Sequence, residues 1–145
     1  MARVKIDLPE HFSFTTVVPV RITDLNYGGH LGNDSILTLA HEARMQYLQS
    51  FGYSETDLGG VGMIMADAAI EFKQEVFYGD RVEISVAAAN FSAVSFDLYY
   101  KLEKPRDGNK VLVAAIKTGM VCFDYSKKKV ARLPDTVREK IAAAG

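Results

Sequence analysis

One polar stretch near the start of the chain carries most of the residue types that acyl-transfer chemistry uses. It runs Thr23-Asp24-Leu25-Asn26-Tyr27-Gly28-Gly29-His30-Leu31-Gly32-Asn33 and combines a carboxylate, two amides, a histidine and three glycines. A carboxylate or histidine can move a proton, an amide can orient water, and glycines let a ligand approach the backbone closely. The stretch is therefore either a turn with a helix cap or an active-site loop.

A helix is predicted directly after this loop. Apolar residues between Ser35 and Phe51 recur at spacings of three and four, and Gly52 follows as a C-terminal glycine would. Asn33 and Asp34, like Ser35, are able to cap the helix start. Because the first N–H groups of a helix and its dipole favour negative charge, we expect this helix start to suit an oxyanion or a phosphate.

The rest of the pattern predicts an antiparallel sheet against this helix. A β-branched strand is expected over residues 14–22, and its Pro19 is typical of an edge strand. Further strands are expected over residues 63–72, 81–89, 92–102 and 111–123, with a terminal helix over residues 135–144. The predicted fold class is α+β, a single domain over residues 1–145 in which one long helix lies across a curved sheet.

Composition argues against several function classes. With 17 basic and 18 acidic residues the net charge is −1, so no positive surface for nucleic acid or an anionic membrane is indicated. No apolar run reaches the roughly 20 residues that a membrane-spanning helix needs. The lone Cys122 cannot form an internal disulfide, and the charged N-terminal residues are unlike a secretion signal. We therefore expect a cytoplasmic protein with a small-molecule partner.

No metal site is indicated. His11, His30 and His41 do not have the helical spacing of paired metal ligands, and Cys122 has no companion cysteine. The chain also lacks a Gly-x-Ser-x-Gly elbow and a phosphate-binding P-loop.

The order of these elements and several short motifs resemble the hotdog-fold acyl-CoA thioesterases of the 4-hydroxybenzoyl-CoA thioesterase type and, more distantly, the plant acyl-ACP thioesterases. The matching segments are residues 20–25, 30–33, 41–44, 78–80 and 132–134. The resemblance implies a hotdog fold and hydrolysis of an acyl thioester carried on coenzyme A or acyl carrier protein. It also implies active sites at a homodimer interface, often within a homotetramer, and no cofactor, because coenzyme A is part of the substrate.

The resemblance assigns roles within the loop, with one departure. In the family pattern Asp-x-Asp-x-x-Gly the second aspartate is the usual catalytic carboxylate, and Asn26 stands there, whereas Asp24 matches the first. An amide can orient water but cannot take its proton. By the resemblance, the backbone amide of Asn33 holds the oxyanion. The histidine of the plant-type pattern is kept as His30, although Gly28 replaces an asparagine of that pattern.

Two carboxylates are the main candidates to replace the missing acid. Other hotdog thioesterases carry a working carboxylate on the central helix, which points to Glu42. Helical geometry turns this residue away from the apolar stripe, and the resemblance implies a dimer in which that side meets the partner subunit. Alternatively, Glu42 is solvated or paired with Arg44 or a neighbour. Asp24 is close enough to act through a water, or else it only forms a turn. Asp67, in an apolar strand, is a third and weaker candidate.

The remaining loop residues each have a functional and a structural interpretation. His30 donates to the thioester carbonyl or binds the leaving thiolate, or it is a structural hydrogen-bonding residue. Gly28 and Gly29 allow substrate to approach the backbone, or they are turn glycines. The candidate basic residues to bind the nucleotide of coenzyme A are Lys73, Arg81, Lys104 and Arg106, and the sequence does not rank them.

Two functions follow. The first is an acyl-CoA thioesterase with Glu42 or Asp24 as the base and Asn26 orienting water. The alternative is a binding protein of the same fold in which the asparagine at position 26 has abolished catalysis.

Overall fold

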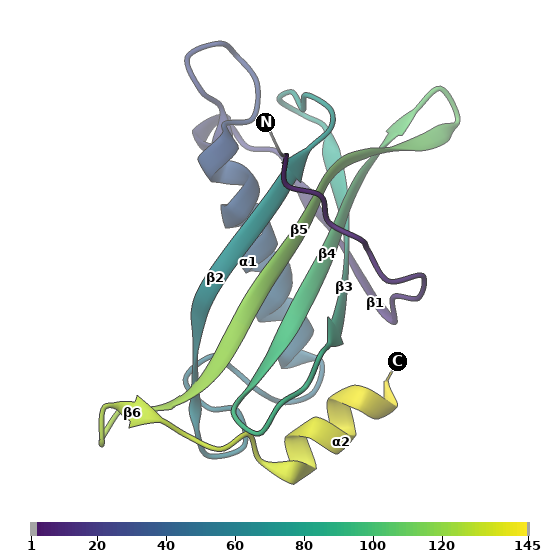
Figure 1. Cartoon of the computed structure of the whole chain (residues 1–145). Helices are drawn as coiled ribbons and strands as arrows, with labels where there is room; N and C mark the ends of the chain where they lie inside the picture. Colours follow the sequence, from purple (N-terminus) through teal and green to yellow (C-terminus); the bar gives the residue numbers. More distant parts are fainter. Residues whose placement is uncertain (1–2, 145) are drawn as a thin grey trace.

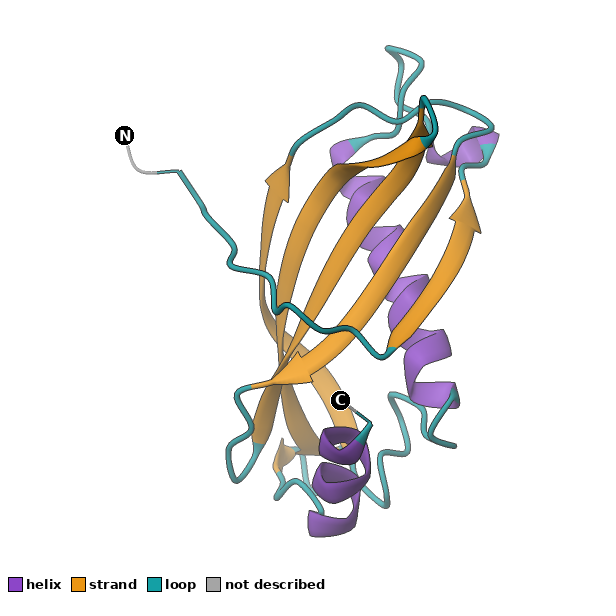
Figure 2. Ribbon diagram, turned by 90° about the vertical axis from the view of Figure 1, so that its right-hand side faces the viewer, coloured by secondary structure: helices purple, strands orange, loops and turns teal. Residues whose placement is uncertain are grey.

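One long helix lies across one face of an antiparallel sheet, in a computed structural model that describes residues 3–144 (Figures 1 and 2). The elements are β1 (Phe14–Pro19), α1 (Asn33–Gln49), β2 (Gly62–Phe72), β3 (Arg81–Ala89), β4 (Ser95–Arg106), β5 (Asn109–Asp124), β6 (Lys129–Val130) and α2 (Asp135–Ala143). The strand order is β1-β3-β4-β5-β2, and the short β6 pairs with β5. The expected α+β class and hotdog arrangement are confirmed.

Element boundaries differ from the predicted ones for local reasons. β1 ends at Pro19, earlier than expected, because the chain turns into a short 3-10 helix over Ile22–Asp24. β4 and β5 are longer than expected because their hairpin closes in two residues, Asp107 and Gly108, with φ of 51° and 80°. Two consecutive residues with positive φ match the twist of a hairpin, so the polar residues around them stay in the strands.

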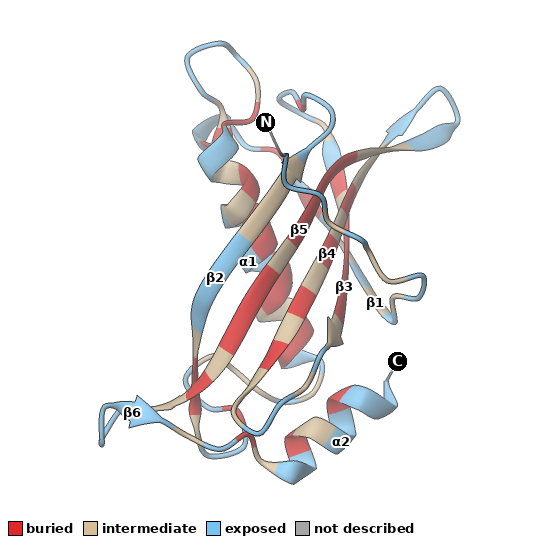
Figure 3. Ribbon diagram, viewed as in Figure 1, coloured by how far each residue is buried: buried red, intermediate tan, exposed pale blue. Residues whose placement is uncertain are grey.

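The core lies between α1 and the central strands (Figure 3). The predicted apolar stripe of α1 is buried, from Ile36 through Leu39, Ala40 and Ala43 to Tyr47. It faces fully buried side chains of the sheet, among them Ile84, Leu98, Leu102 and Ile116. Burial of this stripe against the sheet fixes which way the two ends of α1 point.

The N-terminal segment partly covers the outer face of the sheet, whereas one sheet edge is exposed. The segment before β1 crosses the outer face of the sheet, opposite α1, where the Ile6 N–H donates to Glu71 and Phe12 lies under Lys101 (Figures 1 and 2). β2 is an edge strand, and its Met65–Ala68 segment is exposed (Figure 3). Neither helix of the described residues is long and apolar enough to cross a membrane.

Candidate active site

Asp24 builds the loop that precedes α1. Its carboxylate accepts the backbone N–H of Arg21 at 2.8 Å and lies 3.4 Å from the same residue's guanidinium. Its backbone carbonyl accepts the Gly32 N–H at 3.1 Å. Asp24 is only 4% exposed and does not line the cleft described below. The structure thus shows the turn-forming arrangement, and a catalytic role for Asp24 stays a prediction.

A tight turn places the side chains of Asn26 and His30 close together. The Asn26 N–H donates to the His30 carbonyl at 2.8 Å, and Gly29 has a φ of 84°. The side-chain oxygen of Asn26 accepts the Gly28 N–H at 2.8 Å, and its amino group has no hydrogen-bond partner within residues 3–144. A Cβ added to Gly28 would lie 3.2 Å from the Asn26 oxygen and 3.3 Å from His30 Nε2.

The start of α1 keeps its backbone donors available. α1 begins at Asn33, near the predicted start, and its N-cap is Gly32 rather than one of the predicted cap residues; Gly32 has no side chain to cap the first turn. The Ile36 N–H makes the first hydrogen bond into the helix, to Gly32 at 3.2 Å, and the Asn33 N–H has no partner among residues 3–144. Such a free N–H at the positive end of the helix dipole is a suitable oxyanion donor.

Asn26, His30 and Asn33 line one cleft of about 350 Å³. Asn26 and His30 come from the loop, Asn33 and Ile36 from α1, and the opposite wall is residues 72–76. The wall is held in place by the Leu31 N–H, which donates to the Val76 carbonyl at 2.7 Å. The structure therefore brings together Asn26, His30 and Asn33, as the loop motif predicts.

The cleft also contains the carboxylate of Glu75, which the sequence does not predict. Glu75 Oε1 lies 3.8 Å from His30 Nε2, and the ring of Phe77 meets the same imidazole edge to face. Nothing in the sequence around Glu75 marks it, because it follows β2 in an ordinary polar segment. The pairing of His30 with Phe77 and the hydrogen bond from Leu31 to Val76, both across more than 40 residues of sequence, bring it to the site.

Glu42 lies in a different cleft of the same chain. Its carboxylate accepts the Gln46 side-chain N–H at 2.9 Å, and it lines a hollow between α1 and β1 rather than the cleft at the helix start. This agrees with the alternative of an exposed glutamate paired with a neighbour, although the neighbour is Gln46 and not Arg44, which turns into the core and pairs with Glu55. A catalytic role for Glu42 stays a prediction that needs a second subunit.

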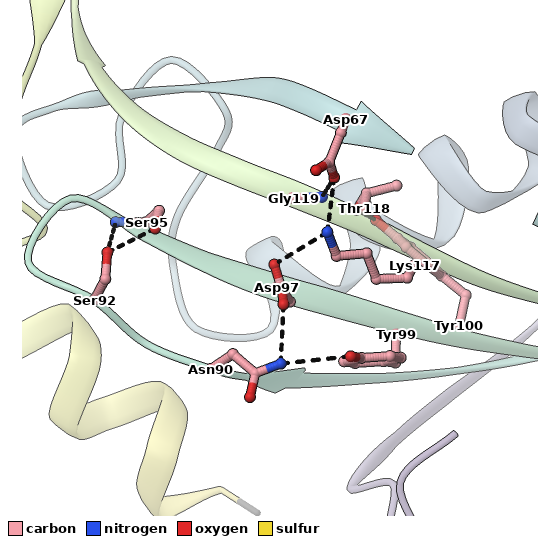
Figure 4. A network of polar contacts seen from close by, with 10 residues as sticks. All are labelled: Asp67, Asn90, Ser92, Ser95, Asp97, Tyr99, Tyr100, Lys117, Thr118 and Gly119. Atoms are coloured by element: carbon pink, nitrogen blue, oxygen red, sulfur yellow. Dashed lines mark hydrogen bonds and ion pairs between the residues drawn. The ribbon is translucent and has the colours of Figure 1, made fainter. Parts of the chain in front are cut away.

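Asp67 lies on the outer face of the sheet (Figure 4). One of its carboxylate oxygens accepts the Gly119 N–H at 2.9 Å and the Lys117 ammonium at 2.8 Å. The hydrogen bond from Lys117 is the main reason why the pKa of Asp67 falls below its usual value. Because Tyr100 and Thr118 lie on the α1 side of the sheet, Asp67 is separated from the cleft by the sheet itself. Nothing in this arrangement supports a catalytic role for it.

Cys122 is buried, as its apolar surroundings predict. Burial raises the pKa of its thiol to about 11. A thiol with so high a pKa is a poor nucleophile near neutral pH.

The structure ranks the basic residues that the sequence leaves equal. Lys73, Lys104 and Arg106 line a hollow of about 510 Å³ that shares residues 73–75 with the cleft, whereas Arg81 does not line it. The Lys104 ammonium is held by the Glu75 carbonyl at 2.6 Å and by Asp80 at 3.2 Å. Lys73 and Arg106 are exposed, although the Lys73 ammonium also donates to the Glu71 carboxylate at 2.6 Å.

Known proteins share this sequence pattern and this geometry. A family model described as the thioesterase-like superfamily matches residues 20–141. The chain belongs to this superfamily. It is 27% identical over 122 residues to a 1,4-dihydroxy-2-naphthoyl-CoA hydrolase of Microcystis aeruginosa, covering 82% of this chain and 86% of the relative. A relative of the same name from Nostoc punctiforme is 27% identical over 128 residues, covering 86% and 84%.

Solved structures agree with the thioesterase assignment. The structure of a 1,4-dihydroxy-2-naphthoyl-CoA thioesterase from Synechocystis superposes with a TM-score of 0.78 at 25% identity, covering 89% of this chain and 95% of that one. Family membership together with these hydrolases supports thioester hydrolysis and not the catalytically silent alternative. The protein is a thioesterase of the hotdog fold.

Proposed function

We propose that this thioesterase hydrolyses acyl-CoA in the cleft formed by Asn26, His30 and Asn33. The observation that supports this most strongly is that Asn33, whose N–H has no partner in the described part of the chain, lines the same cleft as His30. A thioester carbonyl placed at the helix start would receive this N–H as its oxygen becomes negative in the transition state. The amino group of Asn26 is placed to orient the attacking water.

Glu75 supplies the base that the asparagine at position 26 cannot. Water attacks the carbonyl carbon, its proton passes to Glu75 directly or through His30, and the C–S bond breaks to release the thiolate. A separation of 3.8 Å between Glu75 and His30 is long for a hydrogen bond, yet contacts of this kind often tighten when substrate binds. Asp24 acts only by holding the loop, since its carboxylate is already occupied by Arg21.

A homodimer is proposed to complete the cleft. β2 is an edge strand of 11 residues, and two of the four residues of its exposed Met65–Ala68 segment are alanines. A long open strand edge favours pairing with another strand. In such a dimer, the exposed Glu42 face of α1 is the competing source of a carboxylate. Assembly into a tetramer also stays a prediction.

Coenzyme A is the proposed carrier. The exposed Lys73 and Arg106 lie beside the cleft, where they could meet the phosphates of its nucleotide. The named hydrolases act on a naphthoyl thioester of coenzyme A, and an aryl or similar acyl group is proposed here by analogy. Acyl carrier protein as the carrier, and the cytoplasmic location, stay predictions.

Glu75→Gln and Glu42→Gln form a matched pair that tests the base. Both residues are exposed glutamates, one in the cleft and one outside it. Glu75→Gln should lower kcat for acyl-CoA hydrolysis by about 100-fold, the usual contribution of a general base, whereas Glu42→Gln should leave it within about two-fold. Thiol release from a panel of acyl-CoAs measures both. A loss confined to Glu42→Gln would instead assign the base to Glu42.

A further inference from the structure

A buried arginine lies beside a second, smaller hollow along α1. Arg44 is 6% exposed, although it sits in the stripe that the sequence predicts to be apolar. It lines a hollow of about 220 Å³ between α1 and β2, together with Asp34, Leu37, Thr38, His41 and Met65. A guanidinium loses much hydration free energy on burial, so its presence here requires specific partners.

Part of the guanidinium is fixed by such partners. Arg44 Nε donates to Glu55 at 2.7 Å, and Nη1 donates to the Tyr100 hydroxyl at 3.1 Å. The Tyr100 hydroxyl lies 2.8 Å from that of Thr118, and both residues are fully buried. The pKa of Arg44 is raised, because the lowering effect of burial is exceeded by the effects of Tyr100 and Glu55. The side chain is therefore charged and held in one orientation.

One nitrogen of the Arg44 guanidinium is left unpaired within the described residues. Nη2 has no hydrogen-bond partner among residues 3–144, yet no side-chain nitrogen or oxygen of these residues is both fully buried and unpaired. Nη2 must then be reachable from the hollow that Arg44 lines. A preoriented donor at the wall of a small, partly apolar hollow is how binding sites recognise a single polar atom.

This hollow and the proposed active-site cleft are lined by adjacent residues of α1. Asn33 and Ile36 line the cleft, and their neighbours Asp34 and Leu37 line the hollow. Arg44 follows Asn33 by 11 residues, or about 16 Å along the helix, and its side chain leans back toward the helix start. A group bound to Nη2 would thus lie roughly 10 Å from the oxyanion donor, the length of a medium chain or a fused ring.

The charges around the hollow favour an uncharged ligand atom. The Glu55 carboxylate already pairs with Arg44 and lies 3.2 Å from His41 Nε2, and Asp34 adds a second negative charge at the rim. A carboxylate brought here would meet two others. An uncharged oxygen accepts a hydrogen bond from Nη2 without that repulsion.

We infer that Arg44 determines acyl specificity by donating to an uncharged oxygen, a hydroxyl or keto group, at the far end of the acyl group. This inference rests on the proposed function, since it takes the cleft at the start of α1 to be the place of hydrolysis. It adds a subsite for a remote oxygen, with Leu37 and Met65 lining the path to it.

Two pairs of substrates test the inference without any variant. ω-Hydroxyoctanoyl-CoA is compared with nonanoyl-CoA, and naphthoyl-CoA with a hydroxyl on the ring remote from the thioester is compared with its methyl analogue. In each pair a methyl replaces the hydroxyl at similar size. In at least one pair kcat/KM should favour the hydroxyl member by about ten-fold or more, because a site built to donate to an oxygen discriminates against an analogue that lacks it.

Variants separate recognition from a structural role. Arg44→Met should bring the ratio within the preferred pair to about one, and Arg44→Lys, which keeps a buried positive charge, should reduce it if the methionine variant does not fold. Glu55→Gln keeps the Arg44 donors and should preserve the ratio even where it lowers the melting temperature.

Three results would overturn the inference. They are equal rates within both wild-type pairs, an Arg44→Met variant in which both members fall equally, or a preference for an ω-carboxyl chain over both linear substrates. Absence of thiol release from every substrate would count against the proposed function itself.

Discussion

Gly28 and Gly29 are neighbours that serve the loop in different ways. A Cβ at Gly28 would press on the side chains of Asn26 and His30, whereas a Cβ at Gly29 would meet no atom within 4 Å. Gly29 instead needs its positive φ of 84°. One residue leaves room in the cleft, and the other allows the backbone to turn.

The two glycines should therefore respond differently to alanine. Gly28→Ala is expected to lower kcat by displacing Asn26 and His30, with little change in melting temperature. Gly29→Ala is expected to lower the free energy of unfolding by about 1–2 kcal/mol, the cost of a left-handed backbone for a residue with a Cβ. Kinetics and thermal unfolding of both variants measure this. An unchanged kcat in Gly28→Ala would show that its space is not needed by the site.

The sequence predicts the part of the site whose residues are close together along the chain. Asn26, His30 and Asn33 lie within eight residues, and their turn chemistry is enough to bring them together. The sequence does not predict Glu75, because its position depends on the pairing of the loop with the segment after β2. The sequence also does not predict the burial of Arg44, because its partner Tyr100 lies on a distant strand.

Helix α1 is joined to the centre of the sheet by a buried polar link as well as by apolar packing. Tyr100 of β4 contacts both Arg44 of α1 and Thr118 of β5 through its hydroxyl. The next residue along the strand, Tyr99, points to the outer face and meets the exposed Asn90 at 3.4 Å (Figure 4). The two tyrosines thus form a matched pair with opposite environments.

Removing the hydroxyl of Tyr100 should lower the free energy of unfolding more than removing that of Tyr99. Tyr100→Phe leaves Arg44 Nη1 and the Thr118 hydroxyl without this partner and should cost about 1–3 kcal/mol in the free energy of unfolding. Tyr99→Phe should cost less than about 0.5 kcal/mol, because water replaces its exposed contact. Urea unfolding at one protein concentration measures both. Equal losses would show that the buried link does not contribute to the packing of α1.

The strands and helices themselves follow from residue periodicity. The three-and-four spacing of α1 and the alternation in β4 survive in the structure because each has one apolar face to bury. The ends of these strands and helices are predicted less well than their existence. β4 passes through Pro105 toward a two-residue turn, and the pairing with β5 that extends it is not visible in local sequence.

The whole molecule has two strand edges that differ in their suitability for pairing. The β1 edge is short and carries Pro19, which has no N–H to donate, whereas the β2 edge is long and exposed at Ala68. A dimer should therefore form through β2. The sequence implies a dimer only through its resemblance to a family, because the exposure of a strand edge depends on the strand order.

Lysine substitutions at the two edges test this arrangement. Ala68→Lys should shift the protein toward monomer in sedimentation velocity and lower turnover, because a charge on an edge strand opposes pairing. Val17→Lys, at the exposed middle of β1, should change neither. The proposed interface would be refuted by a dimer that resists the first change and dissociates with the second.

We propose that the catalytic carboxylate lies across the cleft from position 26, at Glu75. Thiol release from acyl-CoA by the wild type, by Glu75→Gln and by the double variant Asn26→Asp/Glu75→Gln tests this assignment. We expect Glu75→Gln to lose about 100-fold in kcat and an aspartate at position 26 to restore at least a tenth of the wild-type rate. A Glu75→Gln protein that turns over as fast as the wild type would contradict it.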